Sequence, residues 1–176
     1  MKFHALAIPG AFRVEAERIE DERGFFARTF CREEFAAHGL AADLAQCSTS
    51  FNRARGTLRG LHLQEAPHAE TKLVRCTRGA IRDVIVDLRR GSAAFLKWEA
   101  SELSAENGAA VYVPEGCAHG FLTLADESEV LYQMSMPFHA ASAMGVRWDD
   151  PAFAIDWRDE VRVIAERDRT WPDFAR

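Results

Sequence analysis

Several features are missing from this sequence, and each absence excludes a class of protein. No apolar run reaches the length of a membrane span, and the apolar stretch at the N-terminus is too short for a signal peptide. The 4 cysteines are widely spaced without a C-x-x-C pair, so neither a disulfide framework nor a zinc knuckle is indicated. The net charge of −5 argues against nucleic acid as the main partner, since phosphate backbones need a basic surface. We therefore expect a cytoplasmic protein that binds neither membranes nor nucleic acid.

Repeats, linkers and low-complexity tracts are also missing, and what remains has the composition of one folded unit. With 48% apolar and 28% charged residues, disorder is not indicated. A chain of 176 residues is long enough to bury one good core. We expect a single domain over residues 1–176.

Short strand-like segments separated by turns run through most of the chain. In residues 80–88 apolar and acidic residues alternate, which puts Asp83 on the face opposite the valines. Residues 106–108 (Glu-Asn-Gly) form a strong hairpin turn, and residues 32–38 favour one short helix. Many short strands with Gly and Pro turns predict an all-β sandwich or jelly roll with a few short peripheral helices.

The last fifth of the chain, residues 148–176, has bulky aromatic residues without a clean period, followed by a charged stretch. We expect this segment to form a C-terminal tail that packs over the barrel as loops or short helices. The alternative is that it also supplies a carboxylate to the functional site.

The central segment of the sequence is Arg59–Gln64, which is followed by Lys72. Side chains alternate along a strand, so His62 lies on the face opposite the two leucines of this segment. An imidazole can accept a proton at neutral pH, and two cations are not easily buried unpaired. The pattern is typical of a site built on a strand, although a half-buried strand with a solvated polar face fits it as well.

The pattern Pro114-x-Gly116-x-x-His119 is that of the second cupin motif, a turn that aims a histidine into a barrel mouth. Metal-binding cupins carry His-x-His and a glutamate in the first motif, whereas Gln64 here stands where the second histidine should be. The candidate ligands that remain are His62, His119 and, as a third, Glu70, which make a poor ligand set for a metal. We expect no metal and no other cofactor, so the site must work by acid and base.

Three side chains have the chemistry for that work, together with a carboxylate. His62 can act as a general base, which contributes about 10²–10⁴-fold to a rate. Lys72 can stabilise a developing enolate oxygen. Tyr132, with a reference pKa near 10, can return a proton from another direction, or it can be an ordinary aromatic of a sheet.

Collinear segments between about residues 12 and 172 together resemble the dTDP-4-dehydrorhamnose 3,5-epimerase family. The resemblance implies a cupin jelly roll, a homodimer and no metal. It also implies epimerisation of a nucleotide-linked 4-keto-6-deoxyhexose, of the dTDP-4-dehydro-6-deoxyglucose type, at C3, C5 or both through an enolate. The segments are Asp21–Phe26, Leu58–Gln64, Lys72–Cys76, Leu103–Asn107, Pro114–Phe121 and Trp148–Pro151.

The same resemblance implies roles for individual residues. His62 matches the base and Asp168 the aspartate that orients it, while Lys72 matches the lysine that stabilises the enolate. Tyr132 matches the tyrosine that reprotonates the carbon from the opposite face. The remaining matches are to ligand-binding positions: Arg23, Phe26, Gln46, Ser48, Arg59, His119, Phe138 and Arg167.

Two of these ligand-binding positions have specific expectations. Arg59 is expected to bind the diphosphate, for which its planar fork is well shaped. Phe138 stands where the family has a tyrosine that stacks on the thymine base of the nucleotide. Asp83 is expected to be either a further partner of His62 or the partner of a nearby arginine.

The sequence departs from the family at positions that bind the nucleotide and substrate. Gln46 is followed by Cys47 and Ser48 instead of Asp and Asn, and Arg28 and Ala143 both replace glutamates. The sequence therefore does not decide which nucleotide base is bound, which sugar is the substrate, or which carbon is inverted. The rival functions are a cupin 3,4-ketoisomerase, a non-catalytic sugar-nucleotide-binding cupin and a metal-dependent dioxygenase.

Overall fold

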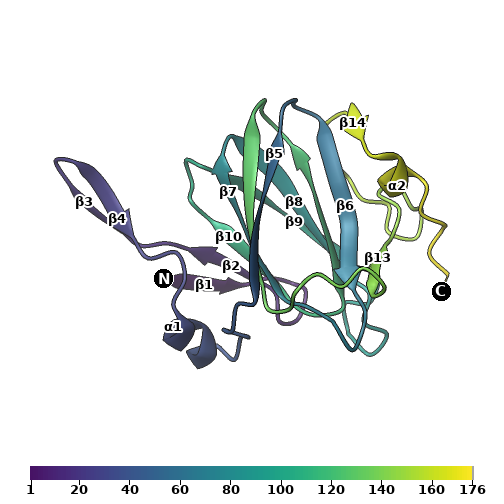
Figure 1. The fold of residues 1–176 in the computed structure, drawn as a ribbon, viewed down its shortest axis with the longest axis horizontal. Helices are drawn as coiled ribbons and strands as arrows, with labels where there is room; N and C mark the ends of the chain where they lie inside the picture. The colour runs from purple at the N-terminus through teal and green to yellow at the C-terminus, as the bar shows by residue number, and fades with distance from the viewer. Residues whose placement is uncertain (176) are drawn as a thin grey trace.

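The computed structural model describes residues 1–175, and most of its regular structure is β-strand (Figure 1). One large sheet has the order β1-β2-β10-β7-β12-β5, and the other has the order β13-β6-β11-β8-β9 with β14 parallel to β6. Strands that follow one another in the sequence often lie in different sheets, as in a jelly roll. The first sheet contains β1 (Lys2–Ala5), β2 (Phe12–Glu15), β5 (Gln46–Asn52), β7 (Lys72–Arg78), β10 (Ala110–Val113) and β12 (Ser128–Met134). The second contains β6 (Thr57–Gln64), β8 (Ala80–Asp87), β9 (Trp98–Ser104), β11 (Cys117–Thr123), β13 (Ala143–Gly145) and β14 (Val163–Ile164).

The other elements are peripheral. β3 (Arg18–Asp21) and β4 (Gly24–Ala27) form a hairpin that projects from the body of the protein, with α1 (Arg32–Ala37) near its base (Figure 1). α2 (Glu166–Arg169) lies near the C-terminus beside β6. The predicted all-β jelly roll with short peripheral helices is therefore confirmed. None of the helices in residues 1–175 is long and apolar enough to span a membrane.

The main hydrophobic core contains residues from both large sheets. Val74 of β7 and Val130 of β12 belong to it from the first sheet, and Ile85 of β8 and Phe121 of β11 from the second. All four are at most 1% exposed, and burying each such side chain contributes about 1.5–3 kcal/mol. This core holds the two sheets together.

A second apolar cluster joins strands of the second sheet to the C-terminal segment. Leu61 and Leu63 of β6 belong to it, on the face opposite His62 as their alternation predicts. Phe153 and Trp157 of the segment are also members and are only 5% and 6% exposed. The second sheet is thus buried on both faces, and Asp83 is only 1% exposed.

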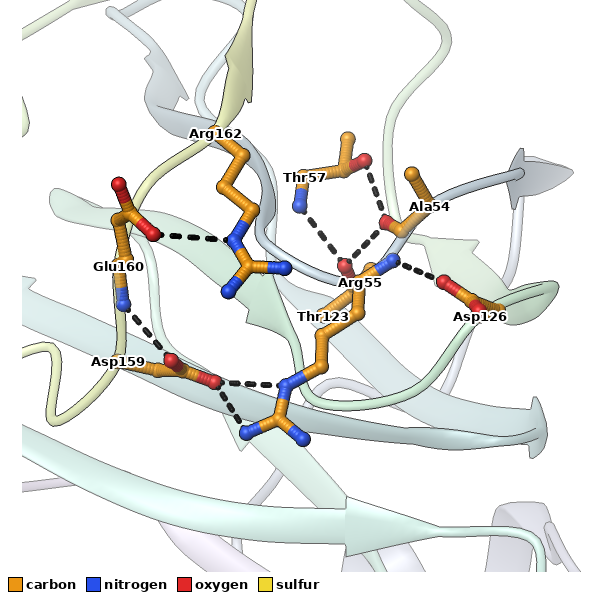
Figure 2. Close-up of polar contacts among 8 residues, drawn as sticks. All are labelled: Ala54, Arg55, Thr57, Thr123, Asp126, Asp159, Glu160 and Arg162. Carbon is orange, nitrogen blue, oxygen red and sulfur yellow. Dashed lines mark hydrogen bonds and ion pairs between the residues drawn. The ribbon is translucent and has the colours of Figure 1, made fainter.

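Polar contacts fix the C-terminal segment to the turn between β5 and β6 (Figure 2). The Arg55 guanidinium donates to Asp159 Oδ2 over 2.9 and 2.7 Å, and its backbone N–H donates to Asp126 Oδ1 over 2.7 Å. The Arg162 amide donates to the Gly56 carbonyl over 2.8 Å, just before β14 pairs with β6. These contacts hold the C-terminal segment beside β6 at β14. α2 begins two residues after β14 ends.

Candidate active site

A cavity of about 340 Å³ is lined by strands of both large sheets. His62 of β6 and His119 of β11 come from the second sheet, whereas Lys72 of β7 and Tyr132 of β12 come from the first. Asp168 of α2 completes this set. The four residues predicted to be catalytic thus line one cavity: His62, Lys72 and Tyr132 come from the two opposite sheets, and Asp168 comes from α2. The remaining lining residues are Gln46, Ser48, Ser50, Arg59, Met134 and Phe138.

His62 and Asp168 form a hydrogen-bonded pair. Nε2 of His62 lies 2.7 Å from Oδ1 of Asp168, and the Gly60 amide donates to Oδ2 over 3.2 Å. When the carboxylate accepts from Nε2–H, the lone pair of the imidazole is on Nδ1. Burial by itself would raise the pKa of Asp168, but the hydrogen bond from His62 and the nearby positive charges outweigh burial and lower it. The pair provides an oriented base.

Asp168 is expected to contribute to stability at neutral pH and to lose that contribution in acid. Its pKa lies below the usual 3.8, so the contribution is fully present above that pH and disappears as the pH falls through the lowered pKa. The free energy of unfolding in urea, measured from about pH 5 to about pH 2, should therefore fall more steeply for the wild type than for Asp168→Asn. Parallel curves for the two proteins would contradict the expectation.

Lys72 and Glu70 form a second, deeper ion pair. Nζ of Lys72 lies 2.7 Å from Oε1 of Glu70, and the two side chains are 10% and 5% exposed. Nζ also donates to the His62 carbonyl over 3.0 Å. Burial lowers the pKa of Lys72, and the Glu70 carboxylate opposes that shift. The pair fixes a cationic group at the wall of the cavity, where it can stabilise a developing anion.

Tyr132 lies on the sheet opposite His62. Desolvation by the surrounding protein raises the pKa of its phenol, so the hydroxyl keeps its proton at neutral pH. The ring meets His119 edge to face, with centroids 5.8 Å apart. A protonated phenol at this place can donate to a carbon atom in the cavity.

The partner of Asp83 was predicted wrongly: it is neither His62 nor an arginine. Oδ2 of Asp83 lies 2.6 Å from Nε2 of His119, and both residues are at most 3% exposed. In the register of β8 with β11, Asp83 is opposite Phe121 and Ile85 is opposite His119, so Asp83 and His119 are diagonal neighbours on one face. Asp83 therefore orients His119.

Most of the predicted ligand-binding residues lie at this cavity. Gln46, Ser48, Arg59, His119 and Phe138 line it directly, and Arg167 lines an adjoining cavity of about 180 Å³ that shares His62 and Lys72.

Two predicted ligand-binding residues lie elsewhere. Arg23 and Phe26 are on the projecting β3–β4 hairpin, where Phe26 is 74% exposed and Arg23 pairs with Asp21. Within one copy of residues 1–175, neither residue lines either cavity.

Two lining residues were not predicted, although the sequence carried a signal for each. Ser50 follows Ser48 by two positions on β5, and Met134 follows Tyr132 by two positions on β12. Side chains two apart on a strand share a face, so extending the alternation would have found both.

The histidines considered as metal ligands bind carboxylates instead. His62 pairs with Asp168 and His119 with Asp83. In the part of the chain that the structure describes, no three His, Cys, Asp or Glu side chains gather as a metal site. The absence of a cofactor stays a prediction.

Comparisons with known proteins agree with this geometry. The sequence profile described as dTDP-4-dehydrorhamnose 3,5-epimerase matches residues 5–176. A dTDP-4-dehydrorhamnose 3,5-epimerase from Sinorhizobium fredii is 41% identical, over 99% of this chain and 90% of its own length.

Solved structures are similar over the whole chain. The dTDP-4-dehydrorhamnose 3,5-epimerase of Bacillus anthracis, with TDP and PPi bound, has a TM-score of 0.95 at 36% identity, covering 98% of this chain and 99% of that one. A 3'-monoepimerase from Streptomyces bikiniensis in complex with dTDP-quinovose has a TM-score of 0.89 at 35% identity, covering 97% and 86%. Sequence, fold and cavity agree, and the chain belongs to the dTDP-4-dehydrorhamnose 3,5-epimerase family.

Proposed function

We propose that this protein is an epimerase that inverts C3, C5 or both in a nucleotide-linked 4-keto-6-deoxyhexose. The observation that carries the proposal is a single cavity in which His62 and Tyr132 come from opposite sheets, with Lys72 beside them. Inversion next to a ketone needs a base on one face of the carbon and an acid on the other. The cavity supplies both, together with a cation for the intermediate.

The chemistry follows from these positions. Nδ1 of His62 removes the proton from the carbon next to the C4 ketone. The electron pair of the C–H bond forms a carbon–carbon double bond to C4, and the π pair of the carbonyl moves to the ketone oxygen. The Lys72 ammonium stabilises the resulting enolate. As the carbonyl forms again, the Tyr132 phenol gives its proton to the same carbon from the other face. Solvent then takes the proton from His62 and returns one to Tyr132. Configuration changes while the oxidation state does not.

The nucleotide is expected at the open side of the cavity. Nε of Arg59 donates to Asn52 Oδ1 over 2.7 Å, and one terminal nitrogen donates to the Phe51 carbonyl over 3.4 Å. The other N–H groups of the guanidinium remain for a diphosphate. Phe138 is 62% exposed, and its backbone N–H donates to Gln46 Oε1 over 3.0 Å. An exposed ring fixed in this way provides a face for a base to stack on.

We also propose that the protein works as a homodimer. The β3–β4 hairpin projects from the body of the protein (Figure 1). Three of its apolar side chains are exposed: Ile19, Phe25 and Phe26, at 69%, 57% and 74%. A second copy would cover these apolar residues and bring Arg23 and Phe26 to a cavity. Sedimentation should give twice the mass of the chain, and Phe26→Ser should shift the equilibrium toward monomer and raise the KM. A wild-type monomer with full activity would contradict the proposal.

A cytoplasmic location is part of the same proposal. All 4 cysteines are free, and Cys76 and Cys117 are buried. Free thiols are usual in a reducing compartment.

Incubation of the wild type in D2O tests the proposed reaction. The substrates are a panel of dTDP-, CDP- and GDP-linked 4-keto-6-deoxy sugars, and NMR reads which carbons gain deuterium and which invert. We expect deuterium and inversion at C3, C5 or both with one member of the panel. A carbonyl moved to C3 would instead identify a ketoisomerase, and binding without deuterium would identify a non-catalytic cupin.

A further inference from the structure

Glu70 has a buried carboxylate oxygen that nothing in residues 1–175 binds. Its Oε1 pairs with Lys72 Nζ over 2.7 Å, whereas Oε2 is buried without a hydrogen-bond partner. The residue is 8% exposed. Burying a charged oxygen without a partner is costly, and buried polar groups are nearly always bonded. An acceptor oxygen of this kind, in a residue that lines a cavity, lacks the donor that its burial requires.

Glu70 lines the smaller cavity of about 180 Å³, which adjoins the catalytic one and shares His62 and Lys72 with it. Gln64 is another polar residue of this cavity, and its side-chain amide already has hydrogen-bond partners. Its Nε2 donates to the carbonyls of His68 and Pro137 over 2.9 and 3.3 Å, and its Oε1 accepts from the His139 amide over 2.5 Å.

Much of the remaining lining of this cavity is apolar. Its apolar residues are Leu63, Met134, Met136, Phe138, Ala143 and Met144. In such surroundings a free carboxylate oxygen strongly favours a ligand that places a hydrogen-bond donor beside it, since apolar atoms offer it nothing.

We propose that Oε2 of Glu70 accepts a hydrogen bond from the sugar hydroxyl on C3, the carbon beside the ketone. This inference rests on the proposed function, in which Lys72 meets the ketone oxygen on C4. Because the carboxylate is in direct contact with Lys72 Nζ, the ligand group within its reach is one that neighbours the ketone. C3 carries a hydroxyl and C5 of a 6-deoxy sugar carries a methyl group, so only the C3 side offers a donor. Glu70 thus distinguishes the C3 side of the sugar ring from the C5 side.

Titration calorimetry with three unreactive probes tests the contact. The probes are dTDP-6-deoxyglucose, dTDP-3,6-dideoxyglucose, which lacks the C3 hydroxyl, and dTDP alone. A hydrogen bond between a hydroxyl and a charged group is worth about 10- to 100-fold in affinity. Glu70→Gln keeps the size of the side chain and an acceptor for Lys72 but loses the charge. Glu70→Gln should lower the affinity for dTDP-6-deoxyglucose by that factor and leave the affinities for the other two probes nearly unchanged.

The wild type gives a second measurement that needs no variant. It should bind dTDP-6-deoxyglucose about 10- to 100-fold more tightly than the 3-deoxy probe. Glu65→Gln is the matched control, because it removes the same charge from an exposed position near Glu70. It should leave all three affinities unchanged.

Each other outcome overturns the proposal. Equal weakening of all three probes by Glu70→Gln would place the carboxylate against the nucleotide, and no weakening would leave it without a contact. A wild type that binds none of the dTDP probes would contradict the proposed function for this nucleotide as well. If the wild type binds all three without discriminating the C3 hydroxyl, only the role of Glu70 fails.

Discussion

Replacing His62 by asparagine should slow deuterium exchange at the carbon next to the ketone by about 10²–10⁴-fold, the contribution of a positioned general base. Asparagine is of similar size and still offers a polar group to Asp168, so the pocket is kept while the basic nitrogen is lost. His62 is held to Asp168 over 2.7 Å, and its orientation is part of what is lost. The readout is NMR of the substrate in D2O.

Two further variants separate the contribution of the base from that of its orienting partner. They are Asp168→Asn and the double variant that combines it with His62→Asn. Residues that act as a unit are strongly non-additive, so the double variant should be little slower than His62→Asn alone. His4→Asn is the matched control, since His4 is an imidazole on β1 whose side chain is 54% exposed and outside the cavity. Exchange at the wild-type rate in His62→Asn would mean that another group removes the proton.

The parts of the site that the sequence predicts are those that depend on one strand. Alternation along β6 predicts that His62 lies on the face opposite Leu61 and Leu63. In the structure both leucines belong to the second apolar cluster, and His62 lines the catalytic cavity. Local sequence patterns carry this information because it depends on neighbouring residues alone.

What the sequence could not predict depends on how distant strands are aligned. Asp83 and His119 meet only because β8 and β11 pair in one particular register, and a shift by one residue would send one of them to the other face. Arg23 and Phe26 were assigned to the site by resemblance alone. The hairpin holds them away from the cavity of their own chain, so their predicted role depends on the proposed homodimer.

Replacing Tyr132 by phenylalanine should separate the two proton transfers, and this is the sharper test of the proposed mechanism. Removal of the substrate proton by His62 does not need the phenol, so deuterium exchange should continue. Return of a proton from the opposite face does need it, and inversion should fall by about 10²–10⁴-fold. Phenylalanine keeps the ring that packs edge to face on His119, so the pocket should keep its shape.

Tyr112→Phe is the matched control, because the chain contains only 2 tyrosines. Tyr112 is 5% exposed in the apolar cluster with Phe35 of α1, and its hydroxyl accepts from the Ala41 amide over 3.0 Å. Losing that bond should cost about 1 kcal/mol of stability and leave inversion unchanged. In Tyr132→Phe, NMR should find substrate that has gained deuterium with its configuration retained. Inversion at the wild-type rate would remove Tyr132 from the mechanism, whereas equal loss of exchange and inversion would show that the phenol also assists enolate formation.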